Sequence, residues 1–186
     1  MSKKNSVAAR TALARSAAGL ALWCITAAVA QETAPGSIPD SIKPPATERL
    51  ILTAHASGAQ IYVCQAATSG EPQWTLKAPD AQLRDRKGSL IIRHYAGPTW
   101  KHQDGSEVTG KAVARAESPD PGSIPWLLVT ATGHAGHGVL TQVTSVQRVH
   151  TQGGKAPPAT GCDASKLGSE VRSPYSADYY FYAPAK

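Results

Sequence analysis

From Glu48 onward, glycine, proline, aspartate and serine divide the sequence into short apolar runs. The runs are rich in Val, Ile, Thr and Tyr, and no window shows the 3.6-residue period of an amphipathic helix. Runs of this length and spacing predict an all-β domain, a single antiparallel β-sandwich or barrel of about eight strands. The predicted strands are residues 50–55, 60–65, 74–77, 90–95, 111–116, 126–131, 142–149 and 178–182. Single helical turns near residues 80–85 or 164–167 are compatible with the pattern.

Residues 1–30 have the composition of a secretory signal peptide. Four basic residues precede an alanine-rich apolar stretch that ends in Ala28-Val29-Ala30, a small-x-small cleavage site. The apolar stretch is shorter than the roughly 20 residues that span a membrane. Cys24 follows the bulky Trp23, which is atypical of a lipid-modified cysteine, so we assign it to the removed peptide. We therefore expect a secreted or periplasmic protein with no membrane span after cleavage.

Cleavage changes the charge balance of the chain. Removing Lys3, Lys4, Arg10 and Arg15 leaves 15 basic and 13 acidic residues, so the formal charge falls from +6 to +2. The basic character belongs mostly to the targeting segment, and the electrostatic case for a nucleic-acid partner is lost. We expect a monomer that binds no nucleic acid.

Two cysteines, Cys64 and Cys162, remain after cleavage. In an oxidising compartment an isolated pair is most simply a disulfide, and two buried thiols are the alternative. Their spacing fits no zinc pattern.

The mature chain divides into two parts. Residues 31–47 contain four prolines and predict an extended lead-in, and residues 48–186 suit one all-β domain. Residues 151–174 read as a long irregular loop, which Cys162 would tie down. In the aromatic strand that follows, Ala177, Tyr179 and Phe181 share one face, which we assign to the core. The other face is either an aromatic platform or a packing surface under the long loop.

Residues 88–110 hold the densest polar and aromatic chemistry. They read as a strand, a Gly97-Pro98 corner and a hairpin closed by Asp104-Gly105. A weak candidate ligand site consists of His94, Tyr95, Trp100 and Asp104, in which His94 and Asp104 would polarise a ligand and the aromatic rings would stack on it. In the structural alternative His94 bonds to Asp104 and Trp100 closes the sheet edge. In the enzymatic alternative His94 and Asp104 act as an acid–base pair.

Other chemistries find less support. His134 and His137 could share a metal, but no carboxylate or thiolate lies near them, so a flexible surface loop is favoured and no metal is expected. Gly133-x-x-Gly136-x-Gly138 is followed by a strand-like segment rather than a helix, so we expect no dinucleotide and no other cofactor. No G-x-S-x-G motif is present, and Ser106 is best explained as a serine that bonds its own turn.

Several separated motifs together resemble the family called domain of unknown function 3455. They are GAQIYVC at 58–64, HYAGPTW at 94–100, IPWLL at 124–128, QRV at 147–149, Cys162-Asp163 and YSADYYFY at 175–182. The resemblance implies a secreted single-domain protein whose two cysteines occupy motif positions, and it implies no activity. The loop at 133–138 departs from the family pattern. We expect a non-enzymatic binding or envelope-associated module for a polar small molecule or glycan, with a secreted hydrolase or other enzyme as the alternative.

Overall fold

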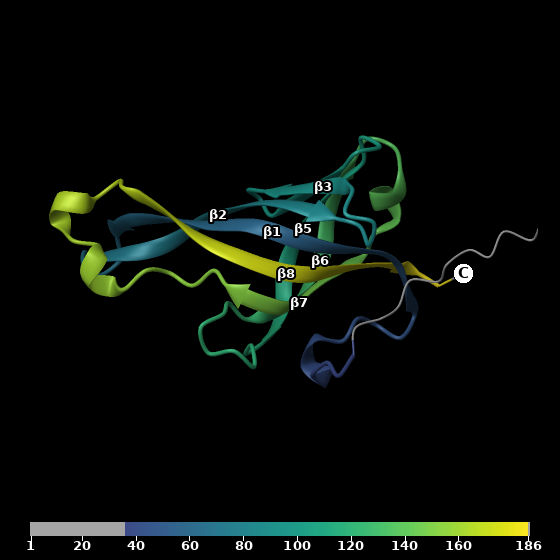
Figure 1. Ribbon diagram of the computed structural model, residues 1–186, viewed down its shortest axis with the longest axis horizontal. Coiled ribbons are helices and arrows are strands. Elements are labelled where there is room, and N and C mark those ends of the chain that lie inside the picture. The colour runs from purple at the N-terminus through teal and green to yellow at the C-terminus, as the bar shows by residue number, and fades with distance from the viewer. Residues whose placement is uncertain (1–35, 186) are drawn as a thin grey trace, which may run out of the picture. The chain divides into compact units, whose positions relative to one another are not determined.

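The computed structural model describes residues 36–185, and eight strands in this range form one antiparallel sheet (Figure 1). Each strand pairs with the next along the chain and the last pairs with the first, so the sheet closes into a ring. The all-β prediction is confirmed. The strands are β1 (Glu48–Ala66), β2 (Pro72–Arg84), β3 (Leu90–Tyr95), β4 (Thr99–His102), β5 (Glu107–Ala116), β6 (Trp126–Ala135), β7 (Ser145–Gly153) and β8 (Glu170–Pro184). The short 3-10 turns are η1 (Asp40–Ile42), η2 (Val139–Gln142), η3 (Ala159–Gly161) and η4 (Ala164–Lys166).

The predicted signal peptide at residues 1–30, with Cys24, lies outside the described residues, as does the start of the lead-in. The described part of the lead-in contains the single 3-10 turn η1. Its Ile42 is fully buried, and the Ile42 carbonyl accepts a 2.7 Å hydrogen bond from Nε2 of Gln147. Among residues 36–185, no helix is both long and apolar enough to cross a membrane.

The two faces of β8 pack against two different hydrophobic clusters. Ala177, Tyr179 and Phe181 are at most 1% exposed and belong to the main core, so their predicted face is confirmed. Tyr180, on the other face, packs against a second cluster that includes Ile42 and Trp126. The lead-in therefore covers part of this face.

The predicted boundaries of the first strands differ from those in the structure. Residues 50–55 and 60–65 belong to the single strand β1, which continues through Gly58. A side chain at Gly58 would lie 2.2 Å from the carbonyl oxygen of Asp80, so the glycine allows β1 and β2 to approach closely here instead of breaking the strand. Residues 80–84, where the sequence pattern was compatible with a helical turn, continue β2, and a turn follows at 85–88.

The segments after β6 and β7 also differ from expectation. Residues 139–142 form the turn η2 rather than a strand, and β7 starts only at Ser145. The predicted loop at 151–174 is shorter in the structure, because β7 continues to Gly153 and β8 begins at Glu170. The turn expected at 164–167 is present as η4.

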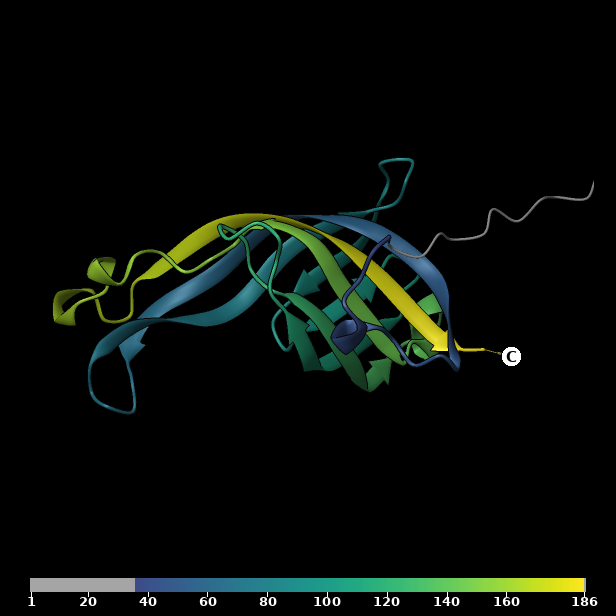
Figure 2. The same ribbon diagram turned by 90° about the horizontal axis from the view of Figure 1, so that it is seen from below.

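A disulfide joins Cys64 in β1 to Cys162, at a sequence separation of 98 and with 5.4 Å between their Cα atoms. In Figure 2 the ends of β1, β2 and β8 extend together beyond the ring, and η3 and η4 lie beside them. Backbone hydrogen bonds from Cys64 N to Ser169 O and from Gly168 N to Cys64 O hold the same segment to β1. The expected disulfide is confirmed.

Candidate functional site

The corner at residues 88–110 folds as β3, β4 and the start of β5. Tyr95 pairs with Thr99 across the first turn, and Lys101 pairs with Glu107 across the second. The hairpin predicted at Asp104-Gly105 is confirmed. Because side chains alternate along a strand, His94 points to the inside of the ring while Arg93 and Tyr95 are exposed.

His94 is only 3% exposed and its ring stacks on Trp100, with centroids 4.4 Å apart and planes 5° apart. Nδ1 lies 2.9 Å from the carbonyl oxygen of Thr99, which can only accept, so Nδ1 carries the proton and Nε2 has a free lone pair. Burial lowers the pKa of His94 to about 3, and the charge of Arg148 acts in the same direction, although the bond to Thr99 opposes them. His94 is therefore neutral near pH 7.

Trp100 lies in the middle of an aromatic cluster. The edges of its ring and those of Tyr179 and Phe181 meet at centroid distances of 6.0 and 6.3 Å. Trp100 is 2% exposed, yet its Nε1 has no hydrogen-bond partner among the described residues. The indole thus packs in the core, and its N–H is a donor without a partner among the described residues.

Tyr95 belongs to the outer surface. Its hydroxyl donates to Oε2 of Glu107 at 3.2 Å, and Nζ of Lys101 lies 2.6 Å from Oε1 of the same carboxylate. Tyr95 therefore does not share a site with His94.

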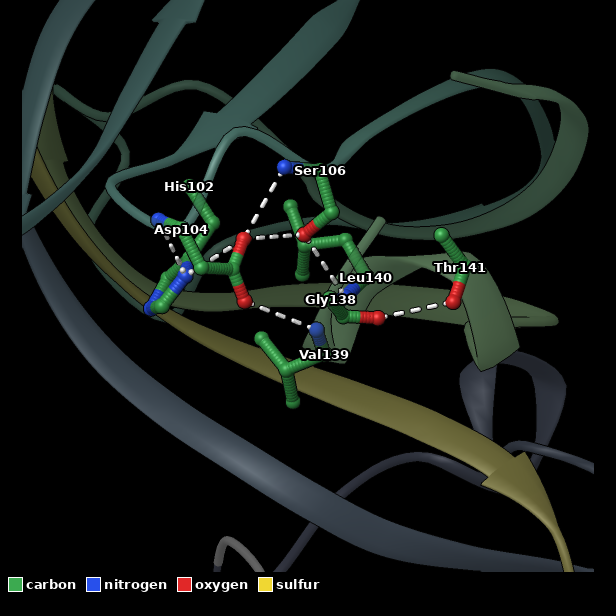
Figure 3. Close-up of polar contacts among 7 residues, drawn as sticks. All are labelled: His102, Asp104, Ser106, Gly138, Val139, Leu140 and Thr141. Carbon is green, nitrogen blue, oxygen red and sulfur yellow. Dashed lines mark hydrogen bonds and ion pairs between the residues drawn. The ribbon is translucent and has the colours of Figure 1, made fainter. Parts of the chain in front are cut away.

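Asp104 has partners other than His94 (Figure 3). Its Oδ1 accepts hydrogen bonds from the backbone N–H and the hydroxyl of Ser106, at 2.9 and 2.6 Å, and lies 3.0 Å from Nδ1 of His102. Its Oδ2 accepts from the N–H of Val139 at 2.8 Å. Burial by itself raises the pKa of Asp104, but these hydrogen bonds together lower it well below its usual range. The carboxylate is a tether between the hairpin and η2, and the postulated bond to His94 is replaced by these contacts.

The glycine-rich segment at 133–138, predicted to be a flexible surface loop, forms the end of β6 and the turn before η2, and it packs on this tether. A side chain at Gly138 would lie 2.1 Å from Oδ2 of Asp104, and one at Gly136 would lie 2.2 Å from the carbonyl oxygen of Gly105. The Ser106 hydroxyl also accepts from the N–H of Leu140 at 3.1 Å. His134 lies in β6, where its Nε2 is 2.7 Å from the carbonyl oxygen of Val143. Within residues 36–185 no group of three or more His, Cys, Asp or Glu side chains could hold a metal ion.

A cavity of about 610 Å³ lies within the ring beside the β3–β4 turn, since each of the eight strands contributes to its lining. Small-molecule sites have volumes of roughly 300–1,000 Å³. His94 and Trp100 line this cavity, whereas Tyr95 and Asp104 do not. One lining residue from each strand, in chain order, is Gln60, Lys77, His94, Trp100, Lys111, Leu127, Arg148 and Tyr179.

Two of the cavity's polar residues, Gln60 and Arg148, were absent from the sequence prediction. Gln60 is 2% exposed and its Nε2 has no partner among the described residues. Nη2 of Arg148 donates to the carbonyl oxygen of Pro125 at 2.8 Å, which leaves Nε buried and without a partner in the described range. The only sequence signal for these cavity residues was a polar residue within a predicted strand. Such a residue can equally face solvent, so the signal did not identify them.

The fold and cavity define a class: a disulfide-linked all-β domain whose closed sheet surrounds a partly polar cavity. The chain belongs to the family described as protein of unknown function DUF3455, whose profile matches residues 45–183. The resemblance noted from the sequence motifs is thereby confirmed. No curated protein and no solved structure matches the chain.

Proposed function

We propose that the protein is an exported, non-enzymatic binding protein that holds a polar small molecule or part of a glycan in the cavity within its ring. The observation that carries this proposal is the cavity of about 610 Å³, whose lining includes residues that each carry a buried donor with no partner in the described part of the chain. Buried polar groups without partners are rare in native proteins and destabilise them, so their presence at a cavity supports a ligand.

Two observations favour binding over the acid–base alternative. The recorded contacts of Asp104 are with His102, Ser106 and Val139, so it does not assist His94. The His94 pKa of about 3 is also far from the near-neutral value at which a general base works best.

Export is supported by the signal-peptide composition of residues 1–30 and by the disulfide. Disulfides form and persist in oxidising compartments such as the periplasm and the extracellular space.

A fragment screen by NMR tests the binding proposal with two matched variants. Leu127→Trp places a larger side chain in the cavity lining, whereas Val113→Trp makes the same kind of change at a side chain that is 56% exposed on the outside of β5. We expect fragments to shift the amide signals of residues 60, 127 and 148, and to lose this effect in Leu127→Trp but not in Val113→Trp. Fragments that bind equally well to both variants, or that shift only outer-surface amides, would contradict the proposal.

A further inference from the structure

Three residues of the cavity lining each carry a buried hydrogen-bond donor, and these three donors lack acceptors in the described part of the chain. They are Nε2 of Gln60 on β1, Nε1 of Trp100 on β4 and Nε of Arg148 on β7. Gln60 and Trp100 are each only 2% exposed, so neither donor can be satisfied by bulk solvent. Donors without acceptors call for a ligand that supplies oxygen lone pairs.

The charges around the cavity have one sign. Its lining includes Lys77, Lys111 and Arg148 and contains no aspartate or glutamate. Lys77 forms an ion pair with Glu170 outside the lining, whereas Nη2 of Arg148 donates to the neutral carbonyl of Pro125. A sugar carries no charge that would match the cations of this lining. An anion matches both the charge and the donors.

The rest of the lining is apolar. Leu127 and Val129 of β6 lie beside the rings of Trp100 and Tyr179, and Leu76 is a 51% exposed apolar residue of the lining. A bare inorganic anion would leave this surface unused. A ligand with an apolar body would bury it.

We infer that the ligand is a small organic monocarboxylate, an inference that rests on the binding function proposed above. Its carboxylate accepts hydrogen bonds from Gln60 and Arg148. Its apolar part lies against Leu127 and Val129.

The test is a calorimetric titration of the wild-type protein with octanoate and benzoate, compared with octanamide, benzamide, glucose and inorganic phosphate. We expect a carboxylate to bind and its uncharged amide to bind at least tenfold more weakly. Arg148→Gln should weaken carboxylate binding by roughly 30-fold or more, because it removes the cation that pairs with the anion. Arg93→Gln, which neutralises an exposed arginine on the outside of β3, should leave binding unchanged.

Gln60→Leu gives a second test that does not depend on Arg148. It replaces a buried amide, whose Nε2 has no partner among the described residues, by an apolar group of similar size, so the melting temperature of the ligand-free protein should rise. Carboxylate affinity should fall in the same variant. A purely structural role for Gln60 would lower the melting temperature instead.

The remaining outcomes separate this inference from the proposed function. If an amide or glucose binds as tightly as a carboxylate and Leu127→Trp prevents it, the cavity is a binding site but the anion assignment is wrong. If phosphate binds as well as octanoate, the apolar part of the inference is wrong. If neither carboxylate binds, or if binding is unchanged in both Arg148→Gln and Gln60→Leu, the inference is overturned.

Discussion

The imidazole of His94 lies flat on the indole of Trp100, at 4.4 Å between centroids and 5° between planes. Burial favours the neutral imidazole, because protonation would place a cation in the core beside the charge of Arg148. The two side chains thus serve the core and the cavity wall together.

This relationship predicts how stability depends on pH. The unfolded state binds a proton on His94 below about pH 6.5, whereas the folded state does so only below about pH 3. The free energy of unfolding should therefore fall as the pH drops from about 6.5 toward 3, and His94 accounts for about 2 kcal/mol of the loss between pH 7 and pH 5. Urea unfolding at both pH values measures it. His94→Asn should flatten this part of the profile, while His137→Asn, at an exposed position, should not.

The Asp104 tether predicts a local loss of stability in Asp104→Ala. The substitution removes the acceptor of Val139 N and of both donors of Ser106, so we expect the free energy of unfolding to fall by about 1–3 kcal/mol. Amide hydrogen exchange at Val139 should accelerate. Asp85→Ala is the matched control, since the Asp85 carboxylate accepts from the N–H groups of Lys87 and Ser89 in its own turn. Equal losses in the free energy of unfolding for the two substitutions would contradict a long-range stabilising role of Asp104.

The close contact between Gly138 and the Asp104 carboxylate predicts that substitutions at these two positions have non-additive effects on stability. Gly138 and Gly105 have φ values of +142° and +91°, so alanine is strained at either position. A methyl group at 138 would also overlap Oδ2 of Asp104, whereas one at 105 would meet nothing within 4 Å. Gly138→Ala should be the more destabilising change in thermal unfolding. Its effect should shrink in an Asp104→Ala background, and additive effects would argue against the contact.

The Cys64–Cys162 disulfide should contribute about 2–4 kcal/mol to stability, because it restricts a 98-residue separation in the unfolded chain. Adding a reductant to urea unfolding should shift the midpoint to a lower concentration. The double variant Cys64→Ala and Cys162→Ala should start at the lower midpoint and show no response to reductant. A wild-type midpoint that is insensitive to reductant at full reduction would show that the disulfide stabilises little.

The predicted cleavage site after Ala30 determines the mass that we expect for the exported protein. Intact mass spectrometry of the chain after expression in a secreting host should give a polypeptide that starts at Gln31. It should carry no lipid, because Cys24 is removed with the leader. A retained N-terminus or an acylated Cys24 would contradict the export proposal.

Local patterns in the sequence determined much of the fold. Strand β3, the Asp104-Gly105 hairpin and the buried face of β8 follow from alternation and turn chemistry over a few residues. Motif spacing identified the family, and the presence of two cysteines beyond residue 30 indicated the disulfide. These features depend on neighbours in sequence, which one chain displays directly.

The tertiary structure alone decided which residues share a site. Closure of the sheet brings Gln60, Trp100 and Arg148 to one cavity, although each comes from a different strand. It also separates Asp104 from His94, because Asp104 instead binds Val139, 35 residues further along the chain. Such contacts depend on strand order, register and ring closure, so no short stretch of sequence specifies them.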